Sequence, residues 1–364
     1  MKGWFMNKSK RFVWAGLGLL IIVACMGPVG EAQTYGGTGV LKIKPAARAS
    51  GMGQSGVALY QRAHSIWWNP ALLAQVGNAE GSLTVAKLVP GLADDVYYMN
   101  VAGAKYLEGW GGVAANIMYL SYGQTEAVDT EGTSWGFFTS YEFVPSVGFG
   151  TQLIGGPPGS IVSEIDVGVA LKYVWVDLAP EWAMEIVGVQ KDGRADAFAV
   201  DLGMLWAGEL FLPYALGVNV QNLGSTLVYI EADEGDPLPR NLKAGLALQL
   251  YGSEAFRVIA TFDYNRALID YPDATNNLEA RPKFGWGNTE ELLNSGVEVS
   301  FYDRLNFRAG YVDDPEGEIQ APTFGAGLDV NVSGDYLLRF DYSSVPQALD
   351  LDRVHYISVG VLFE

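Results

Sequence analysis

From residue 81 onward, hydrophobic and polar positions alternate along the chain with a period of two residues. In 197-AFAVDLGMLWAG-208, the parity that runs from Phe198 to Trp206 holds only large apolar side chains, and the other parity holds mostly small residues around Asp201. Successive side chains of a strand point to opposite faces. The pattern therefore predicts a β-strand with one apolar face and one crowded, partly charged face.

Fourteen such segments follow one another, and most are long enough for a tilted strand to cross a bilayer, which takes about 9–11 residues. None of the chain after residue 80 keeps the helical period of 3.6 residues over three turns. Residues 133–145 are a candidate for an additional strand. The fourteen segments lie at 81–88, 96–106, 111–122, 142–154, 164–178, 197–208, 212–222, 241–251, 256–266, 293–303, 305–312, 322–332, 336–345 and 354–363.

The links between these segments alternate in length. Links after even-numbered segments are mostly short turns, with 155–163 as the exception, whereas links after odd-numbered segments are mostly long, including 179–196, 223–240 and 268–292. Short turns on one side and long loops on the other are typical of outer-membrane barrels. We predict an all-β fold, a transmembrane antiparallel β-barrel of about 14 strands at residues 81–364, with both termini in the periplasm.

In such a barrel the large apolar side chains face lipid, and the small and ionisable ones face the lumen. Buried charges need partners, so the luminal charges are interpreted as a structural network that braces the barrel. A polar permeation path is the alternative. The predicted luminal set is Asp166, Lys172, Asp201, Lys243, Arg257, Asp263, Glu298, Arg308, Asp329, Arg339 and Asp341.

Composition and charge support a membrane β-protein. The chain of 364 residues contains 45 Gly, 19 Tyr and 10 Trp, with only 18% charged residues. The predicted long loops account for the whole net charge of −18, which argues against a nucleic-acid partner. We interpret acidic loops such as 231-EADEGD-236 and 313-DDPEGE-318 as solvated; Ca²⁺ binding is the alternative, although neither has the EF-hand spacing.

The first 32 residues have the pattern of an export signal. A basic stretch precedes the apolar run 12-FVWAGLGLLIIVA-24, and Ala32 supplies a small residue for cleavage before Gln33. Cleavage there would remove the only cysteine, Cys25, and with it all thiol chemistry. Two alternatives are an uncleaved anchor and lipidation of Cys25, because 22-IVAC-25 resembles a bacterial lipobox.

We expect no enzymatic activity, no cofactor and no metal site. His64 and His355 are the only histidines and lie near opposite ends of the mature chain. The sequence contains no nucleophile elbow of the Gly-x-Ser-x-Gly type and no phosphate loop.

Residues 33–80 do not alternate and are predicted to fold inside the lumen as a plug. They contain the motif residues Gly51, Met52, Gly53, Trp67 and Trp68, followed by Asn69 and Pro70. We interpret the Asn-Pro pair as a tight turn that seats the plug. Direct contact with a ligand is the alternative.

The plug sequence resembles that of a known family. The runs 46-AARASGMGQSGVAL-59 and 67-WWNPALLA-74 are similar to the opening of PorV/PorQ proteins, which are FadL-like barrels, and 295-SGVEVSFYDRLNFRAGY-311 and 324-FGAGLD-329 match the C-terminal third. A departure is 61-QRAHS-65, where family members tend to carry an acidic pair.

This resemblance implies two functions. PorV-like proteins serve type IX secretion, bind the C-terminal signal of secreted cargo and deliver it to the attachment machinery at the cell surface. FadL-like barrels pass hydrophobic small molecules, which would require a side opening or kink, for which Pro145 and 155-GGPPG-159 are the candidates. The chain also ends on the series Ile357 to Phe363, which resembles the signal read by the barrel assembly machinery, except that Glu364 follows the aromatic residue.

Overall fold

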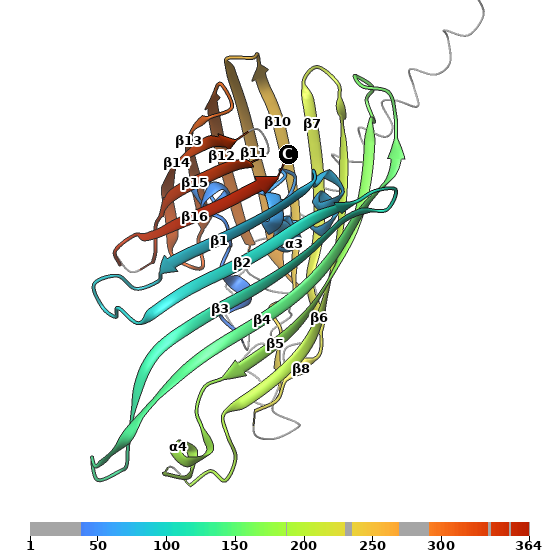
Figure 1. Ribbon diagram of the computed structural model, residues 1–364. Helices are drawn as coiled ribbons and strands as arrows, with labels where there is room; N and C mark the ends of the chain where they lie inside the picture. The colour runs from blue at the N-terminus through green and yellow to red at the C-terminus, as the bar shows by residue number, and fades with distance from the viewer. Residues whose placement is uncertain are drawn as a thin grey trace, which may run out of the picture.

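The computed structural model describes residues 38–186, 188–229, 235–268, 291–333, 336–348 and 351–363. It shows a closed antiparallel barrel of fourteen strands in which each strand pairs with its neighbours along the chain and β1 pairs with β16 (Figure 1). The barrel strands are β1 (Ala79–Lys87), β2 (Val96–Leu107), β3 (Gly111–Val128), β4 (Ser134–Gly155), β5 (Glu164–Asp177), β6 (Arg194–Glu209), β7 (Pro213–Gly224), β10 (Asn241–Gly252), β11 (Phe256–Ala267), β12 (Glu291–Phe301), β13 (Leu305–Asp314), β14 (Ile319–Ser333), β15 (Tyr336–Val345) and β16 (Val354–Phe363).

The fourteen strands match the fourteen alternating segments, which confirms the predicted fold. Residues 133–145 do not form an additional strand, because all but the first belong to β4, which extends to Gly155. The predicted long loop after the third segment is also short. It shrinks to 129–133 because β3 continues through Glu126 to Val128, beyond a bulge at Gly123 where the pairing register with β4 shifts.

The two faces of the strands differ as predicted. Phe198 and Leu171 are 68% and 54% exposed on the outside, whereas Asp201 is fully buried on the inside. Outward tyrosines form a row across β2, β3 and β4, where the ring centroids of Tyr97 and Tyr119 lie 5.9 Å apart and those of Tyr119 and Tyr141 lie 5.8 Å apart. A row of amphipathic rings at one level is typical of a membrane–water interface.

The short turns gather at the barrel end that carries the C-terminus, so this end is periplasmic (Figure 1). At the other end, β3 to β6 project beyond the remaining strands together with α4 (Glu181–Ile186). A two-stranded sheet of β8 (Thr226–Leu227) and β9 (Asp236–Pro237) lies in the link between β7 and β10. In the described part of the chain, no helix has the length and apolar character needed to cross a membrane.

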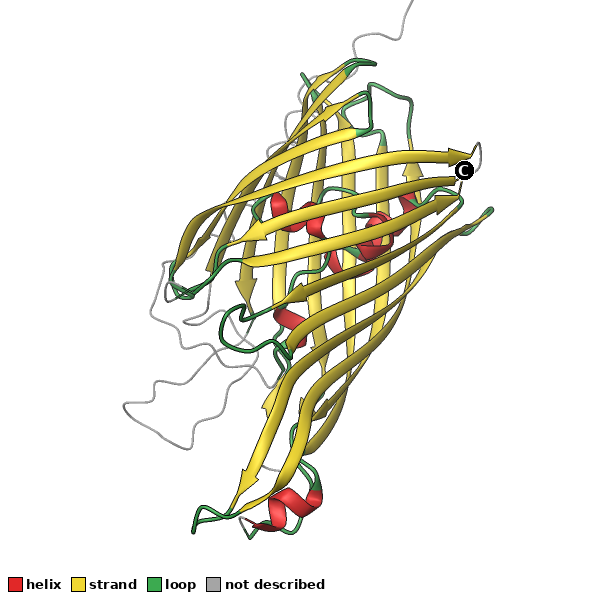
Figure 2. Ribbon diagram, turned by 60° about the vertical axis from the view of Figure 1, so that its left-hand side comes forward, coloured by secondary structure: helices red, strands yellow, loops and turns green. Residues whose placement is uncertain are grey.

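The plug consists of short helices inside the barrel (Figure 2). They are η1 (Val40–Lys42), α2 (Ala47–Gly51), η2 (Arg62–His64), α3 (Ser65–Trp68) and η3 (Pro70–Gln75). Residues from Val40 to Leu73 contribute about half of the fully buried apolar side chains, including Met52 and Trp68, and inward-facing wall residues such as Tyr98 and Met118 contribute many of the others. The hydrophobic core of this protein therefore lies between the plug and the inner wall of the barrel.

Seven luminal glycines explain how closely the plug and the wall approach each other. A Cβ atom at any of them would lie within 3.0 Å of a plug atom, which real Cβ atoms do not tolerate. The atoms met include the carbonyl oxygens of Val57, Leu73 and Pro70. We call these residues the glycine belt: Gly112, Gly150, Gly168, Gly203, Gly217, Gly296 and Gly310. Backbone therefore packs against backbone around much of the circumference.

Candidate functional site

The first described residues of the plug are held by one carboxylate. Glu142 of β4 accepts hydrogen bonds from the backbone N–H groups of Gly39 and Val40, both at 2.9 Å, and from the hydroxyls of Thr38 and Tyr122. Glu142 is 2% exposed. Four donors around one buried carboxylate compensate its lost hydration without a cation.

The Gly51-Met52-Gly53 turn is fixed to the wall formed by β12, β13 and β14. The Gly53 N–H donates to Oγ1 of Thr323 at 2.8 Å, and the Asn294 side chain donates to the Gly53 carbonyl at 2.5 Å. Gly53 has φ +69°, and a side chain there would collide with the Ser295 carbonyl. This position therefore requires glycine for both its backbone conformation and its contact.

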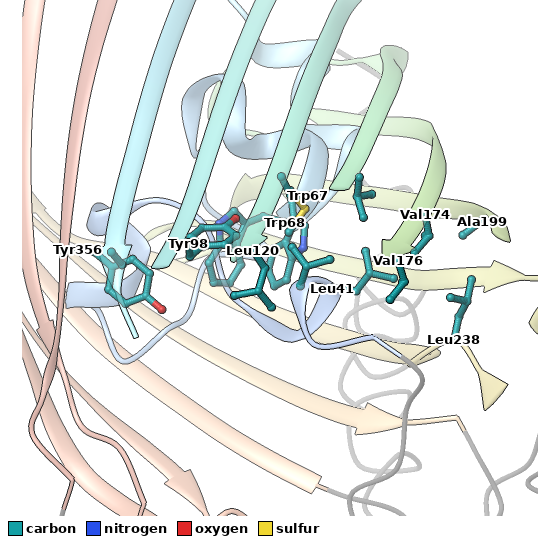
Figure 3. Packing of buried hydrophobic residues seen from close by; sticks show 14 of the residues in the cluster. Leu41, Trp67, Trp68, Tyr98, Leu120, Val174, Val176, Ala199, Leu238 and Tyr356 are labelled. Atoms are coloured by element: carbon teal, nitrogen blue, oxygen red, sulfur yellow. The ribbon is translucent and has the colours of Figure 1, made fainter. Parts of the chain in front are cut away.

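Trp67, Trp68, Asn69 and Pro70 are all buried, and the two tryptophans belong to the apolar cluster shown in Figure 3. The two indole rings meet edge to face with centroids 4.9 Å apart, and Trp68 donates to the Pro45 carbonyl at 3.0 Å. Asn69 caps η3 by accepting from the Ala71 N–H at 3.1 Å. Its amide also donates to the carbonyls of Val57 and Met204, both at 3.0 Å. The geometry is that of a turn seated on β6.

A network of ion pairs occupies the periplasmic half of the lumen. Glu298 accepts from Arg308 at 2.6 Å and from Arg48 of the plug at 2.6 Å, and Arg308 also reaches Asp341 at 2.6 Å. We call these four residues, together with the bidentate pair of Arg339 and Asp329 on β15 and β14, the periplasmic charge network. All of these strands are adjacent, so the network joins the plug to the wall.

The other predicted luminal charges are satisfied differently. Lys172 and Asp201 form a separate buried pair at 2.6 Å. Asp263 accepts from the N–H groups of Gly56 and Val57 at 2.6 and 3.0 Å, so it binds the plug backbone rather than a cation. Lys243 points its ammonium at the face of Trp67, with Nζ 3.5 Å from the ring centroid.

Two predicted members do not join a luminal network. Arg257 lies near the periplasmic start of β11, where its guanidinium pairs with Asp303 in the turn after β12 at 2.9 Å and is 38% exposed. The short turn between β12 and β13 places the Asp303 carboxylate beside this guanidinium. Asp166 is fully buried, and no cation pairs with it among the residues that the structure describes.

Several residues that hold the plug are not in the predicted site. Glu142 and Arg48 are the main ones, and His64 is another. The His64 ring nitrogen Nε2 lies 2.9 Å from Oγ of Ser82, and burial lowers the pKa of His64 to about 4. Arg48 stands inside the quoted motif 46-AARASGMGQSGVAL-59, so that motif was the available signal. No sequence pattern marks Glu142, because its partners come from 20 to 104 positions away.

A cavity of about 290 Å³ lies between the plug and the extracellular ends of β7, β10, β11, β12 and β13. Its described lining carries four cationic side chains, Lys42, Lys44, Arg240 and Lys243, and one carboxylate, Asp314. Five amide side chains and Trp67 complete its polar part. Burial lowers the pKa of Lys44 to about 8, although its ammonium hydrogen-bonds to Gln54 at 2.7 Å.

The remaining predictions concern metal binding, the acidic loops and the C-terminal assembly signal. Within the described residues, no group of three or more His, Cys, Asp or Glu side chains could hold a metal ion. Residues 231–234 of one acidic loop, the predicted signal segment 1–32 and Glu364 lie outside the described residues. Phe363 ends β16, is 42% exposed, and packs edge to face on Tyr336 at 5.4 Å.

The comparison with protein families decides the identity of the barrel. The model of the type IX secretion system protein PorV matches residues 31–274. The chain belongs to the PorV family. It is a type IX secretion-associated barrel that crosses the cell outer membrane many times. A comparison with functionally curated proteins found no match.

Solved structures of similar fold are FadL-like barrels. The Pseudomonas putida toluene transporter TodX is 16% identical with a TM-score of 0.54, covering 92% of this chain and 98% of its own. The Ralstonia pickettii toluene transporter TbuX is 14% identical with a TM-score of 0.51, covering 86% of this chain and 96% of its own. At this identity the likeness shows the fold, a plugged barrel of the FadL type.

Proposed function

We propose that this PorV-family barrel acts as a shuttle or scaffold that binds exported proteins at the outer face of the outer membrane. Family membership carries the proposal. The seated plug supports it, because a lumen filled by backbone contacts suits a rigid binding platform better than a wide pore. The structural role of the predicted site residues, from Asn69 to the periplasmic charge network, belongs to the same proposal.

A pull-down from native outer membranes tests this function. An affinity-tagged chain purified from cells that secrete normally is expected to carry proteins that share a C-terminal domain. A second tagged barrel from the same membranes, with no plug, serves as the control. Equal recovery of these proteins with both barrels, or with neither, would remove the cargo-binding proposal.

The alternative function is passive transport of hydrophobic small molecules. The similar solved structures named as toluene transporters favour it. One wall feature is relevant: Phe143 pairs with Trp175 and Ser146 with Lys172, but the ladder between β4 and β5 is interrupted at Val144 and Pro145. Proline lacks the N–H that the ladder needs.

Liposome uptake of a labelled fatty acid distinguishes the two functions. The shuttle proposal expects no uptake above that of empty liposomes. Uptake that is present in the unmodified chain and lost in Pro145→Val, which restores the missing N–H, would establish the transport alternative instead. Pro90→Val, in the loop between β1 and β2, is the matched control for the same change outside the wall.

A further inference from the structure

Lys243 on β10 is a buried charge that lacks an ordinary partner within the described part of the chain. Its side chain is 2% exposed, and its ammonium has no hydrogen-bond acceptor among the residues that the structure describes. The ring centroids of Trp67 and Trp68 lie 3.5 and 5.2 Å from Nζ. An ammonium has three donors, and contact with a ring face uses its charge without supplying an oxygen acceptor. Lys243 is therefore buried but only partly compensated.

Lys243 lines the extracellular cavity described above, together with Lys42, Lys44 and Arg240. Asp314 is the one carboxylate among the described lining residues, and its Oδ1 accepts from the Gly317 N–H at 2.8 Å. Asp263, farther into the lumen, is occupied by two plug N–H groups. The cavity thus has an excess of positive charge in a chain whose formal net charge is −18.

The remaining lining indicates which kind of anion fits. Gln54, Gln221, Asn222, Asn241 and Asn265 bring amide groups to the cavity. Amides hydrogen-bond well to peptide groups, and the apolar side chains of Leu41, Pro239 and Leu292 in the same lining can pack against an aliphatic or aromatic side chain of a peptide. The cavity volume of about 290 Å³ is at the lower end of small-ligand sites, which run from about 300 to 1,000 Å³. This size suits the end or a side chain of a polypeptide.

We propose that this cavity binds a carboxylate presented by an exported polypeptide, with Lys243 as its central cation. The inference rests on the proposed cargo-binding function and assigns it a site. The peptide enters from the extracellular side. Its carboxylate contacts the ammonium of Lys243 and the cationic side chains of Lys42, Lys44 and Arg240, and its peptide groups hydrogen-bond to the amide side chains. A polypeptide can supply this carboxylate from its C-terminus or from an acidic side chain.

Binding of defined peptides to the full-length barrel in detergent micelles tests the site. Three probes are pools of acetylated hexapeptides. The first pool has a free C-terminal carboxylate, the second a C-terminal amide, and the third a C-terminal amide with one internal Asp. Decanoate is the fourth probe. At least one carboxylate-bearing pool is expected to bind at least about tenfold more tightly than the plain amide pool. The two carboxylate pools together identify the source.

Variants decide whether the cavity is responsible. Two substitutions in the cavity lining are each expected to weaken carboxylate binding at least about tenfold: Lys243→Met, which keeps the side-chain length, and Arg240→Gln. Lys105→Met makes the same chemical change at an exposed position of β2 and should leave binding unchanged. The heat-dependent gel shift of each variant shows whether the barrel has folded.

Three results would overturn the proposal: equal binding of all three pools, unchanged binding in folded Lys243→Met, or tight binding of decanoate alone. Recovery of cargo by Lys243→Met in the native pull-down distinguishes the site from the function. If cargo still co-purifies with that variant at the level of the unmodified chain, the cavity assignment fails while cargo binding stands.

Discussion

The two halves of the lumen satisfy their buried charges in different ways. In the periplasmic charge network, Glu298 meets two arginines and Arg308 meets two carboxylates. Toward the extracellular end, Lys172 pairs with Asp201 and Arg266 with Glu291, each as a single ion pair among the described residues. Glu142 and Asp263 are compensated there by hydroxyls and backbone N–H groups, and Lys243 by an indole face. Paired charges neutralise each other and attract no further ion strongly. A charge that is compensated only by neutral groups keeps its net charge, so it can still attract an ion of opposite sign.

The largest effect is expected at Glu298. Among the described side chains, Glu298→Gln would leave Arg48 without a carboxylate partner and Arg308 with Asp341 alone, so the free energy of unfolding should fall by about 3–5 kcal/mol. Urea unfolding in lipid vesicles measures this change. Glu126→Gln, an exposed position on β3, is the control. A loss below about 1 kcal/mol would mean that the periplasmic charge network contributes little to the free energy of unfolding. The two halves of the lumen would then not differ in how their charges stabilise the protein.

A smaller and local effect is expected at Glu142. Glu142→Gln replaces one acceptor oxygen with an NH₂ group that faces N–H and O–H donors, and should cost about 2–3 kcal/mol at the start of the plug. Amide protection at Gly39 and Val40 should then fall by a factor of about 30 to 150. Hydrogen exchange gives the answer, with Glu108→Gln in a periplasmic turn as the comparison. Unchanged protection would show that the plug entrance is held elsewhere.

Acid should weaken the plug through His64, by about 2 kcal/mol. Burial lowers the pKa of His64 from 6.5 to about 4, so the folded state binds fewer protons than the unfolded state between these values. Stability is therefore lost as pH falls from 6.5 toward 4, at up to about 1.4 kcal/mol per unit. Unfolding at pH 7.5 and 4.5 should show a larger acid loss for the unmodified chain than for His64→Gln. Equal losses would place the acid sensitivity in the carboxylates instead.

The smallest effect on stability is expected at Lys243. Removing a buried ammonium relieves its desolvation and removes its contact with Trp67, and these changes oppose each other. Lys243→Met should alter the free energy of unfolding by no more than about 1 kcal/mol. A loss as large as that of Glu298→Gln would show that buried charges stabilise the folded protein in both halves of the lumen.

The sequence predicted the barrel because alternation and link length are local properties. Strand ends were less predictable: β3 and β4 continue past the membrane region through Glu126 and Trp135, since pairing between two strands can persist where no lipid demands it. The plug was predicted from its lack of alternation and from its family motif. The glycine belt was seen as small residues in limited room, but the cause, contact with plug carbonyls, depends on the folded plug.

The candidate site was predicted in part. The pair of Arg339 and Asp329 follows from adjacent strands and register, and the structure brings the two together. The partner of Lys243 was not predictable, because Trp67 reaches it from a segment far away in the sequence. Arg257 shows the opposite problem: its parity is that of the luminal face, but its position at a strand end gives it a partner in the turn.

The glycine belt also has a consequence for permeability. Where backbone touches backbone there is no room for a column of water, and an ion that loses its hydration shell finds no replacement along peptide groups already bonded to each other. We therefore expect the barrel to conduct few ions, and a single-channel recording in a planar bilayer would test this.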